Sequence, residues 1–363
     1  MILIHKHEDN LYIFIRDWLI HYNYTTSTYT EFQIHQPTDV REKLSEDRNV
    51  AAVSASKDNR LIAVTLCNKQ LVIYDEKLNV IANVVCKRAA CALTFTDDDD
   101  LLIADKTGDV FVYKLDRQPE LLLGHLSMLL DVAVSECGRY VITCDRDEKI
   151  RVSHYPDSYN IASYCLGHEE FVTHLKMYGD ILISAGGDGT VRFWDFVNGR
   201  QLNVVNTNDH LPDKAVVAEF RKEMGVENAD VTALPIVDLQ VYKSEQSAYL
   251  GVRLLGSDSV QVYRLQNASD VRLVDVLTVP SLLAFHLGER LLVVTERGFL
   301  HYTVAPNKLT KTDVSDACFE KCEHLLKDHV SQSKSLFCNL YKRKYDNVQE
   351  YLEKKKMRIE NKS

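Results

Sequence analysis

The chain has 363 residues, of which 45% are hydrophobic and 26% are charged. This composition is typical of a soluble folded protein and excludes a chain that is disordered throughout. The formal charge of −9 argues against a surface that grips nucleic acid everywhere, because binding to phosphates needs concentrated Lys and Arg.

The chain begins with a run of four apolar residues, 1–4, and the sequence DNLYIFI follows at residues 9–15. Charged and polar residues from His5 to Glu8 end the first run. The start therefore has neither a spanning length nor the apolar region of a signal peptide, and we expect an intracellular protein. The Leu-Tyr-Ile-Phe run in residues 9–15 is typical of a strand, and an insertion at about residues 16–47 is expected to follow it.

A turn followed by a short alternating strand recurs along the chain. The clearest copy is GDGTVRFWD at residues 187–195, in which an Asp-Gly turn leads into a strand that ends in Trp-Asp. The last strand positions of the six copies are Tyr74, Tyr113, Ser153, Trp194, Tyr263 and Tyr302. They are 39, 40, 41, 69 and 39 residues apart, and the long step predicts an insertion at about residues 206–230.

Two Gly-His pairs, at residues 124–125 and 167–168, are separated by 43 residues, which is one blade period of a WD-repeat propeller. With residues 9–15 counted as a seventh repeat, we predict an all-β, seven-bladed WD-repeat β-propeller over residues 1–312. We expect residues 2–5 to pair with strands of the last repeat, because closing the ring removes exposed strand edges.

One repeat carries the four side chains that WD repeats join by hydrogen bonds, namely His168, Ser184, Asp188 and Trp194. The preceding repeat offers His125, Thr143 and Asp147 for the same purpose. A His, a Ser and an Asp also suggest a catalytic triad, but these three lie within a strand ladder and not in a pocket. We therefore predict a structural role and no catalytic residue.

Beyond residue 304 the apolar residues change to helical spacing. This change predicts a helical, basic tail over residues 313–363. Residues 341–363 hold eight Lys or Arg against four acids. Two interpretations remain open, a helix packed on the propeller with a solvated basic end, or a binding arm. The candidate RNA contacts are Lys342, Arg343, Lys344, Lys354, Lys355 and Lys356.

The nine cysteines lack CxxC spacing, so we expect buried, reduced thiols and no bound metal. One alternative function is a propeller enzyme whose Asp, Glu and His residues line the central channel. No spacing of these residues in the sequence marks such a site. A second alternative is a scaffold, or a substrate receptor of a cullin-type ubiquitin ligase. Such receptors usually carry Trp-Asp-x-Arg at blade ends, whereas residues 74–77 read Tyr-Asp-Glu-Lys.

Two stretches are more specific than a generic repeat, GHLSMLLDVAVS at residues 124–135 and DRDEKIRVSHYPDSYNIASYCLGHEEFVTHL at residues 145–175. They resemble the WD-repeat non-catalytic subunit of the eukaryotic tRNA (guanine-N7)-methyltransferase. A generic repeat carries Trp where Ser153 stands, so this departure supports the resemblance. The close match covers about fifty residues, and the rest agrees in architecture.

The resemblance implies a heterodimer in which a separate catalytic subunit binds S-adenosylmethionine and methylates N7 of a variable-loop guanine in tRNA. The propeller would dock on that subunit, stabilise it and help to hold the tRNA. No Gly-rich strand-to-helix loop for such a cofactor is evident in this chain, so the methyl donor is expected on the partner. The resemblance also implies a location in the nucleus and no contact with membranes.

The segment that faces the partner in relatives matches residues 167–175 here, so Glu170, Phe171 and His174 are the predicted interface residues. An apolar anchor beside charged groups suits an interaction hot spot, although Phe171 could equally pack into its blade. Relatives usually carry Arg or Lys where His174 stands. For the nearby cluster of Arg146, Lys149 and Arg151 we favour a structural ladder with Asp145, Asp147 and Glu148 over direct contact with RNA.

Overall fold

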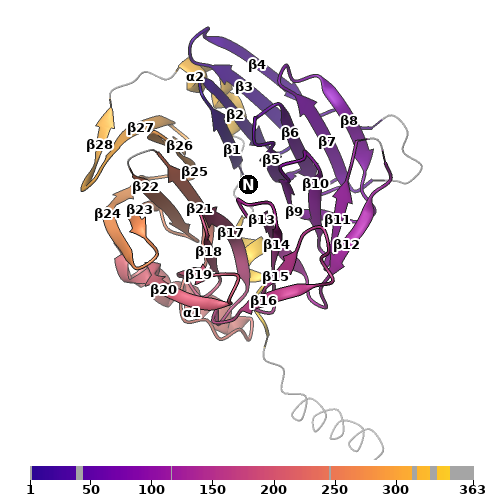
Figure 1. Ribbon diagram of the computed structural model, residues 1–363. Helices are drawn as coiled ribbons and strands as arrows, with labels where there is room; N and C mark the ends of the chain where they lie inside the picture. Colours follow the sequence, from indigo (N-terminus) through magenta and orange to yellow (C-terminus); the bar gives the residue numbers. More distant parts are fainter. Residues whose placement is uncertain are drawn as a thin grey trace, which may run out of the picture.

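Seven four-stranded antiparallel sheets form a closed ring in the computed structural model (Figure 1). The structure describes residues 2–37, 44–115, 117–244, 247–312, 317–327 and 333–343. Each sheet uses four consecutive strands, the first beside the centre of the ring and the fourth at its rim. The predicted fold class, an all-β propeller of seven blades followed by a short helical tail, is confirmed.

The strands have the following bounds in blades 1 to 4: β1 (Ile2–His7), β2 (Asn10–Ile15), β3 (Trp18–Asn23), β4 (Thr28–Gln33); β5 (Val50–Ala55), β6 (Leu61–Leu66), β7 (Gln70–Asp75), β8 (Val80–Val85); β9 (Ala90–Phe95), β10 (Leu101–Asp105), β11 (Asp109–Tyr113), β12 (Glu120–Gly124); β13 (Leu129–Val134), β14 (Tyr140–Asp145), β15 (Ile150–His154), β16 (Ile161–Cys165). Blades 5 to 7 consist of β17 (Val172–Tyr178), β18 (Ile181–Gly186), β19 (Thr190–Asp195), β20 (Arg200–Asn206); β21 (Ile236–Lys243), β22 (Ala248–Leu254), β23 (Ser259–Asn267), β24 (Asp270–Thr278); β25 (Leu282–Leu287), β26 (Arg290–Thr295), β27 (Gly298–Ala305), β28 (Lys308–Thr312). The helices are η1 (Thr207–His210), α1 (Ala215–Val226), α2 (Ala317–Lys327) and α3 (Ser333–Cys338).

The ring closes differently from the prediction. β1 pairs with β2 from Ile2 opposite Ile15 to His7 opposite Asn10, and not with the last blade. A two-residue turn joins these strands, so their hydrogen bonds form without the entropy cost of joining the two ends of the chain. Closure instead comes from apolar side chains of blades 1 and 7 together with α2. The buried residues at this junction include Ile2, Leu11, Ile13, Leu292, Val294, Phe299, Cys318, Cys322 and Leu326.

The insertion predicted at residues 16–47 is wrong in its first half, because β3 and β4 lie there and complete blade 1. β4 has the polar sequence TYTEFQ at the rim, and none of its residues is buried. A rim strand needs few apolar residues, so its sequence is easily mistaken for a loop. The predicted insertion at residues 206–230 contains η1 and α1, and α1 buries Phe220 and Met224.

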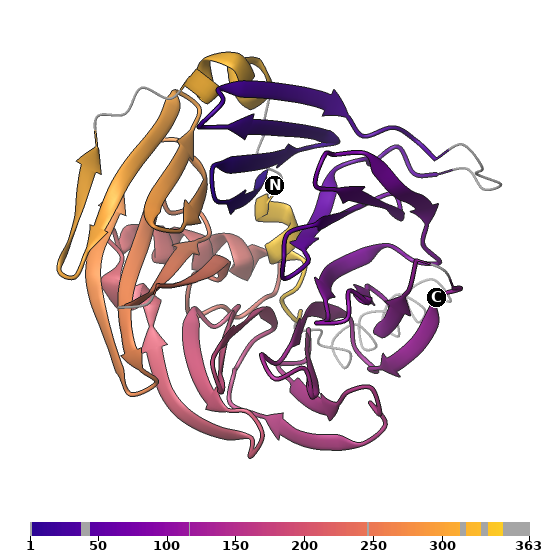
Figure 2. The ribbon, with the colours of Figure 1, turned by 45° about the horizontal axis from the view of Figure 1, so that its top comes forward.

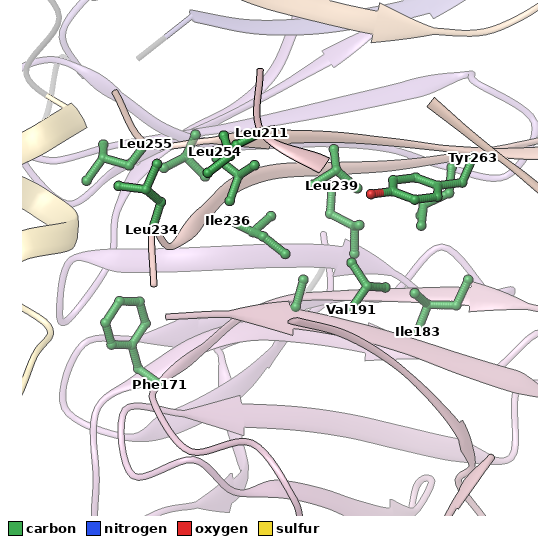
Figure 3. Close-up of a cluster of buried hydrophobic side chains, with 14 of the residues drawn as sticks. Phe171, Ile183, Val191, Leu211, Leu234, Ile236, Leu239, Leu254, Leu255 and Tyr263 are labelled. Atoms are coloured by element: carbon green, nitrogen blue, oxygen red, sulfur yellow. The ribbon is translucent and has the colours of Figure 1, made fainter. Parts of the chain in front are cut away.

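Neighbouring blades are joined by apolar packing and by side chains that bond to the next blade's backbone. Figure 3 shows Ile183 and Val191 of blade 5 facing Leu239 and Tyr263 of blade 6 within one buried cluster. On the inner strands, the Asp131 carboxylate accepts the Leu175 backbone N–H at 2.7 Å. Such bonds fix the angle between blades, because a hydrogen bond is directional and apolar packing is not.

All nine cysteines are free thiols. Six of them are buried, as predicted, whereas Cys137 is exposed and Cys67 and Cys91 are partly exposed. Among the helices that the structure describes, none has the length and apolar composition needed to cross a bilayer.

Candidate functional site

The four predicted tetrad side chains come together in blade 5. The His168 ring lies 2.9 Å from the Asp188 carboxylate through Nδ1 and 2.7 Å from the Ser184 hydroxyl through Nε2. The Trp194 indole N–H donates to the same hydroxyl at 2.8 Å. All four side chains are buried. The hydrogen-bonding capacity of the His and the Ser is therefore used inside the blade, which is a structural role.

The Asp188 carboxylate is held ionised by its neighbours. Burial alone would raise its pKa, but bonds from His168 and Thr190 overcome that effect and lower the pKa to about 2. The Arg192 guanidinium lies 3.4 Å from the Asp188 oxygen that also faces His168. Asp188 therefore ties the turn between β18 and β19 to His168, which precedes β17, and to Thr190 and Arg192 of β19.

Blade 4 has a related arrangement with a different acid from the one predicted. His125 lies 3.0 Å from Asp145 and 2.8 Å from the Thr143 hydroxyl. Asp147 was predicted for this position by analogy with Asp188. Asp145, however, ends β14 where Gly186 ends β18, so its carboxylate reaches the imidazole two residues earlier along the chain.

Two glycines at the turn between β18 and β19 allow the segment that leads into β17 to lie close to that turn. A Cβ at Gly186 would lie 2.0 Å from the Phe171 carbonyl oxygen, and one at Gly187 would lie 2.7 Å from the Phe171 ring. The Gly187 backbone N–H donates to that same Phe171 carbonyl at 2.8 Å. Only glycine fits such an approach of one backbone to another.

We predict that Gly186→Ala lowers the free energy of unfolding by about 2–3 kcal/mol, because the clash is with backbone and cannot be relieved by a rotamer change. Urea denaturation would measure the change. Gly225→Ala in α1 is the control, since a Cβ there meets nothing within 4 Å and alanine favours a helix. Equal stability of the Gly186 variant and the wild type would contradict this account.

Phe171 is not an exposed anchor. It is 1% exposed, and the Tyr341 ring packs edge-on against it with the ring centroids 4.9 Å apart. Tyr341, which follows α3, is also 1% exposed, and its hydroxyl donates to the Gly187 carbonyl at 2.9 Å. In the chain alone the C-terminal segment covers Phe171, which agrees with the alternative that this side chain is packed and not exposed, and its role as an interface anchor stays a prediction.

Glu170, the second predicted interface residue, lies half-buried beside Phe171. Burial raises the pKa of its carboxyl to about 7, and the nearby carboxylates of Glu148, Asp188 and Asp230 act in the same direction. Lys342 partly opposes this shift. The negative charge of a carboxylate among other acids is poorly balanced, so a further cation nearby would stabilise its ionised form.

His174, the third, lies on β17, the innermost strand of blade 5. Burial, helped by Lys176, lowers its pKa to about 3, so the imidazole is neutral at physiological pH. The Thr173 hydroxyl lies 2.8 Å from its Nδ1. His174 and Glu170 therefore have very different electrostatic settings, although they are four residues apart.

Two of the six predicted RNA contacts lie within the described residues, and both pair with acids of this chain. Lys342 forms ion pairs with Glu148 and Asp147, and Arg343 pairs with Glu227 at the end of α1. Lys344, Lys354, Lys355 and Lys356 lie outside the described residues. The pairing of Lys342 and Arg343 with carboxylates reduces their capacity to attract phosphate.

The predicted ladder among the charges of residues 145–151 is also different in the structure. Asp147 and Glu148 pair with Lys342, while the Arg146 guanidinium donates to the Leu340 carbonyl at 2.8 Å. Arg151 donates to the Ser153 hydroxyl at 2.9 Å and to the Ser158 carbonyl at 2.9 Å. Arg151 thus has a structural role within blade 4, whereas Arg146 holds the C-terminal segment. Sequence reasoning assigned Arg146 no such contact, because its partners are about 190 residues away.

A cleft of about 520 Å³ lies next to the tetrad, between blade 5 and α1. Its charged lining residues are Glu169, Asp188, Asp209, Arg192, Lys214 and Arg221. The two signs balance, so the cleft suits polar groups of a protein surface better than a polyanion.

Comparisons with known proteins place this geometry in a family. The family profile described as "tRNA methyltransferase TRM82 WD40 domain" matches residues 114–283, which include the tetrad and Glu170. Two solved structures share the fold at low identity. A chain of the mitotic checkpoint complex has a TM-score of 0.62 at 14% identity, covering 82% of this chain and 86% of that chain. The β-propeller domain of Cps50 (Swd1) from Myceliophteria thermophila has a TM-score of 0.61 at 10% identity, covering 84% and 95%.

Curated relatives are similar over most of the chain. The tRNA (guanine-N(7)-)-methyltransferase non-catalytic subunit wdr4 of Danio rerio is 32% identical over 343 residues, which is 88% of this chain and 79% of that protein. The subunit of the same description from Drosophila melanogaster, wuho, is 32% identical over 86% of this chain and 75% of its own length. The chain therefore belongs to the family of non-catalytic subunits of tRNA (guanine-N7)-methyltransferase.

Proposed function

We propose that this protein is the non-catalytic subunit of a heterodimeric tRNA (guanine-N7)-methyltransferase. In this function it binds and stabilises a catalytic subunit that holds S-adenosylmethionine, and it helps to hold tRNA while a variable-loop guanine is methylated. The observation that carries the proposal is the 32% identity with a subunit of this description over 88% of the chain. A nuclear location belongs to the same proposal and has the basic C-terminal segment as its support.

We assign partner docking to the face around Glu170. Burial and the carboxylates of Glu148, Asp188 and Asp230 raise the pKa of its carboxyl, and Lys342 opposes them only in part. A Lys or Arg on the partner would supply the missing charge and would favour ionised Glu170. The balanced cleft between blade 5 and α1 supports the same assignment, because it can receive polar side chains of both signs.

We assign tRNA contact to the four other candidate RNA contacts of the tail, Lys344, Lys354, Lys355 and Lys356. Lys342 and Arg343 are already paired with carboxylates, so they contribute less to phosphate binding. Contacts of Lys with the phosphate backbone of the tRNA add affinity without reading its sequence. Such contacts fit a non-catalytic subunit that holds folded tRNA by its shape.

Methyl transfer to tRNA by the cognate catalytic subunit, with and without this chain, tests the proposal. We expect methyl transfer to depend on this chain. We also expect Glu170→Arg to lower the activity about tenfold at subsaturating chain concentration, because the variant places a positive charge against the proposed Lys or Arg of the partner. The loss should be overcome by excess variant chain, since it lies in assembly and not in the methyl transfer step.

The matched control is Glu120→Arg, which makes the same charge change on β12 at the rim of blade 3. Glu120 is exposed, and we expect wild-type activity from this variant. Equal losses from both variants would place docking elsewhere. Activity that is independent of the chain would remove the proposed function itself.

A further inference from the structure

The C-terminal arm, defined here as residues 333–343, crosses the face on which Glu170 lies. It consists of α3 and the five residues after it. Figure 2 shows α3 (yellow) near the middle of the ring and close to α1. Tyr341 of the arm lies 154 residues after Gly187, the blade 5 residue to which it bonds, so the arm is a separate layer over that blade.

Tyr341 fastens this arm by apolar packing. Its ring contacts Phe171 of blade 5 at 4.9 Å and Phe220 of α1 at 6.1 Å between centroids. Cys338 and Tyr341 belong to the same buried cluster as residues of blades 5 and 6. Aromatic groups with so little exposure are costly to return to water, so the contact is strong.

Polar contacts fix the arm's position along the face. Arg146 of blade 4 donates to the carbonyls of Leu340 and Tyr341, at 2.8 and 3.4 Å. The Tyr341 hydroxyl donates to the Gly187 carbonyl of blade 5 at 2.9 Å. Lifting the arm would leave the Arg146 guanidinium without its two carbonyl acceptors and the Gly187 carbonyl without its hydroxyl donor.

The arm's charged end is placed among acids from three parts of the chain. Lys342 meets Asp147 and Glu148 of blade 4, and it acts electrostatically on Glu170 of blade 5. Arg343 meets Glu227 at the end of α1. The Lys342 side chain is still 54% exposed, so a molecule arriving at Glu170 encounters it directly.

We propose that the C-terminal arm is itself part of the surface that receives the catalytic subunit: Tyr341 seals Phe171 and sets Lys342 beside Glu170, so the partner meets the arm and the acidic rim together. This inference rests on the proposed function. It fits a partner surface that brings a basic side chain to Glu170 and an acidic or polar one to Lys342. Tyr341 acts in this surface as a positioning residue.

The opposite arrangement is an arm that blocks docking and is displaced by the partner. The contacts disfavour it, because displacement would expose the rings of Tyr341 and Phe171 and would break the bonds to Arg146 and Gly187 together. The two arrangements predict opposite effects when the arm is weakened.

The experiment measures the affinity of the full chain for the catalytic subunit, for wild type and for Tyr341→Ala. We expect Tyr341→Ala to weaken binding about tenfold, and Tyr341→Phe, which loses only the hydroxyl bond, to weaken it less. Tyr74→Ala is the matched control for loss of a buried tyrosine, because Tyr74 is also 1% exposed but lies in blade 2. It should leave the affinity unchanged once folding is verified by near-UV circular dichroism.

Cys338 supplies a second readout that does not depend on affinity. It is 9% exposed within the arm, and labelling by a thiol reagent, followed for that residue by peptide mass spectrometry, reports undocking. We expect faster labelling in Tyr341→Ala than in wild type, and no increase when wild type is saturated with the catalytic subunit.

Three results separate the possibilities. Tighter binding of Tyr341→Ala, or faster Cys338 labelling in the wild-type complex, would mean that the partner displaces the arm and would overturn the inference. Unchanged affinity with undocked Cys338 would place the arm outside the interface and would also overturn it. If wild type does not bind the catalytic subunit, the proposed function fails, and this result is distinct because it appears before any variant is compared.

Discussion

Trp194→Ala is expected to lower the free energy of unfolding by about 3–5 kcal/mol, the largest loss of stability among the changes considered. Trp194 is fully buried and belongs to an apolar cluster that also holds side chains of blade 4, including Tyr140 and Ile142. Its removal leaves a large cavity between two blades. It also leaves the Ser184 hydroxyl without the indole N–H that it accepts.

Urea denaturation followed by circular dichroism would measure this loss. Trp18→Ala is the matched control, because Trp18 is the other of the chain's two tryptophans and is partly exposed on β3. It should cost about 1 kcal/mol. A Trp194 variant that is as stable as the Trp18 variant would show that the blade 4–blade 5 junction does not depend on the indole.

The affinity for the catalytic subunit is expected to rise with pH up to about 7, by as much as tenfold per pH unit. The cause is Glu170, whose pKa in the free chain is raised to about 7 by burial and by Glu148, Asp188 and Asp230, with Lys342 opposing. A cation of the partner lowers this pKa in the complex, so the bound state favours the ionised carboxyl. Binding below that pH must therefore expel a proton, which weakens it.

The same group gives the stability of the free chain an opposite pH dependence. The folded pKa of Glu170 is about 7 and its ordinary value is 4.5, so the folded chain binds the proton more tightly than the unfolded chain. The stability that this group contributes is present below 4.5 and is lost as the pH rises to about 7. More alkaline conditions should thus destabilise the free chain slightly while they strengthen the complex.

Isothermal titration calorimetry at several pH values, in buffers of different ionisation enthalpy, would measure both affinity and proton release. Glu170→Gln is the control, because it keeps the shape and cannot titrate. This variant should bind more weakly above pH 7 and should lose the pH dependence. His174 is not expected to contribute, since its pKa of about 3 keeps it neutral throughout. A pH dependence that survives in Glu170→Gln would assign it to another group.

The repeat could be predicted from consecutive residues alone, because a blade is a local unit. Each turn and strand is encoded within about 40 residues, and the aromatic at the end of the third strand is recognisable one blade at a time. The tetrad of His168, Ser184, Asp188 and Trp194 lies within one such unit, so its spacing could be assigned without coordinates. Family membership follows from the same local segments, which lie within the matched residues 114–283.

Which surfaces remain accessible could be seen only in the folded chain. Phe171 and Tyr341 are 170 residues apart, and no local pattern shows that one covers the other. The same holds for Arg146, because a local ladder of charges was predicted for it, whereas its guanidinium donates to the Leu340 carbonyl of the arm. The prediction of how the ring closes was wrong for a related reason. A two-residue hairpin between β1 and β2 competes with a pairing between the two ends of the chain. Short-range hydrogen bonds and periodicity are written in consecutive residues, whereas exposure depends on what the distant end of the chain packs against.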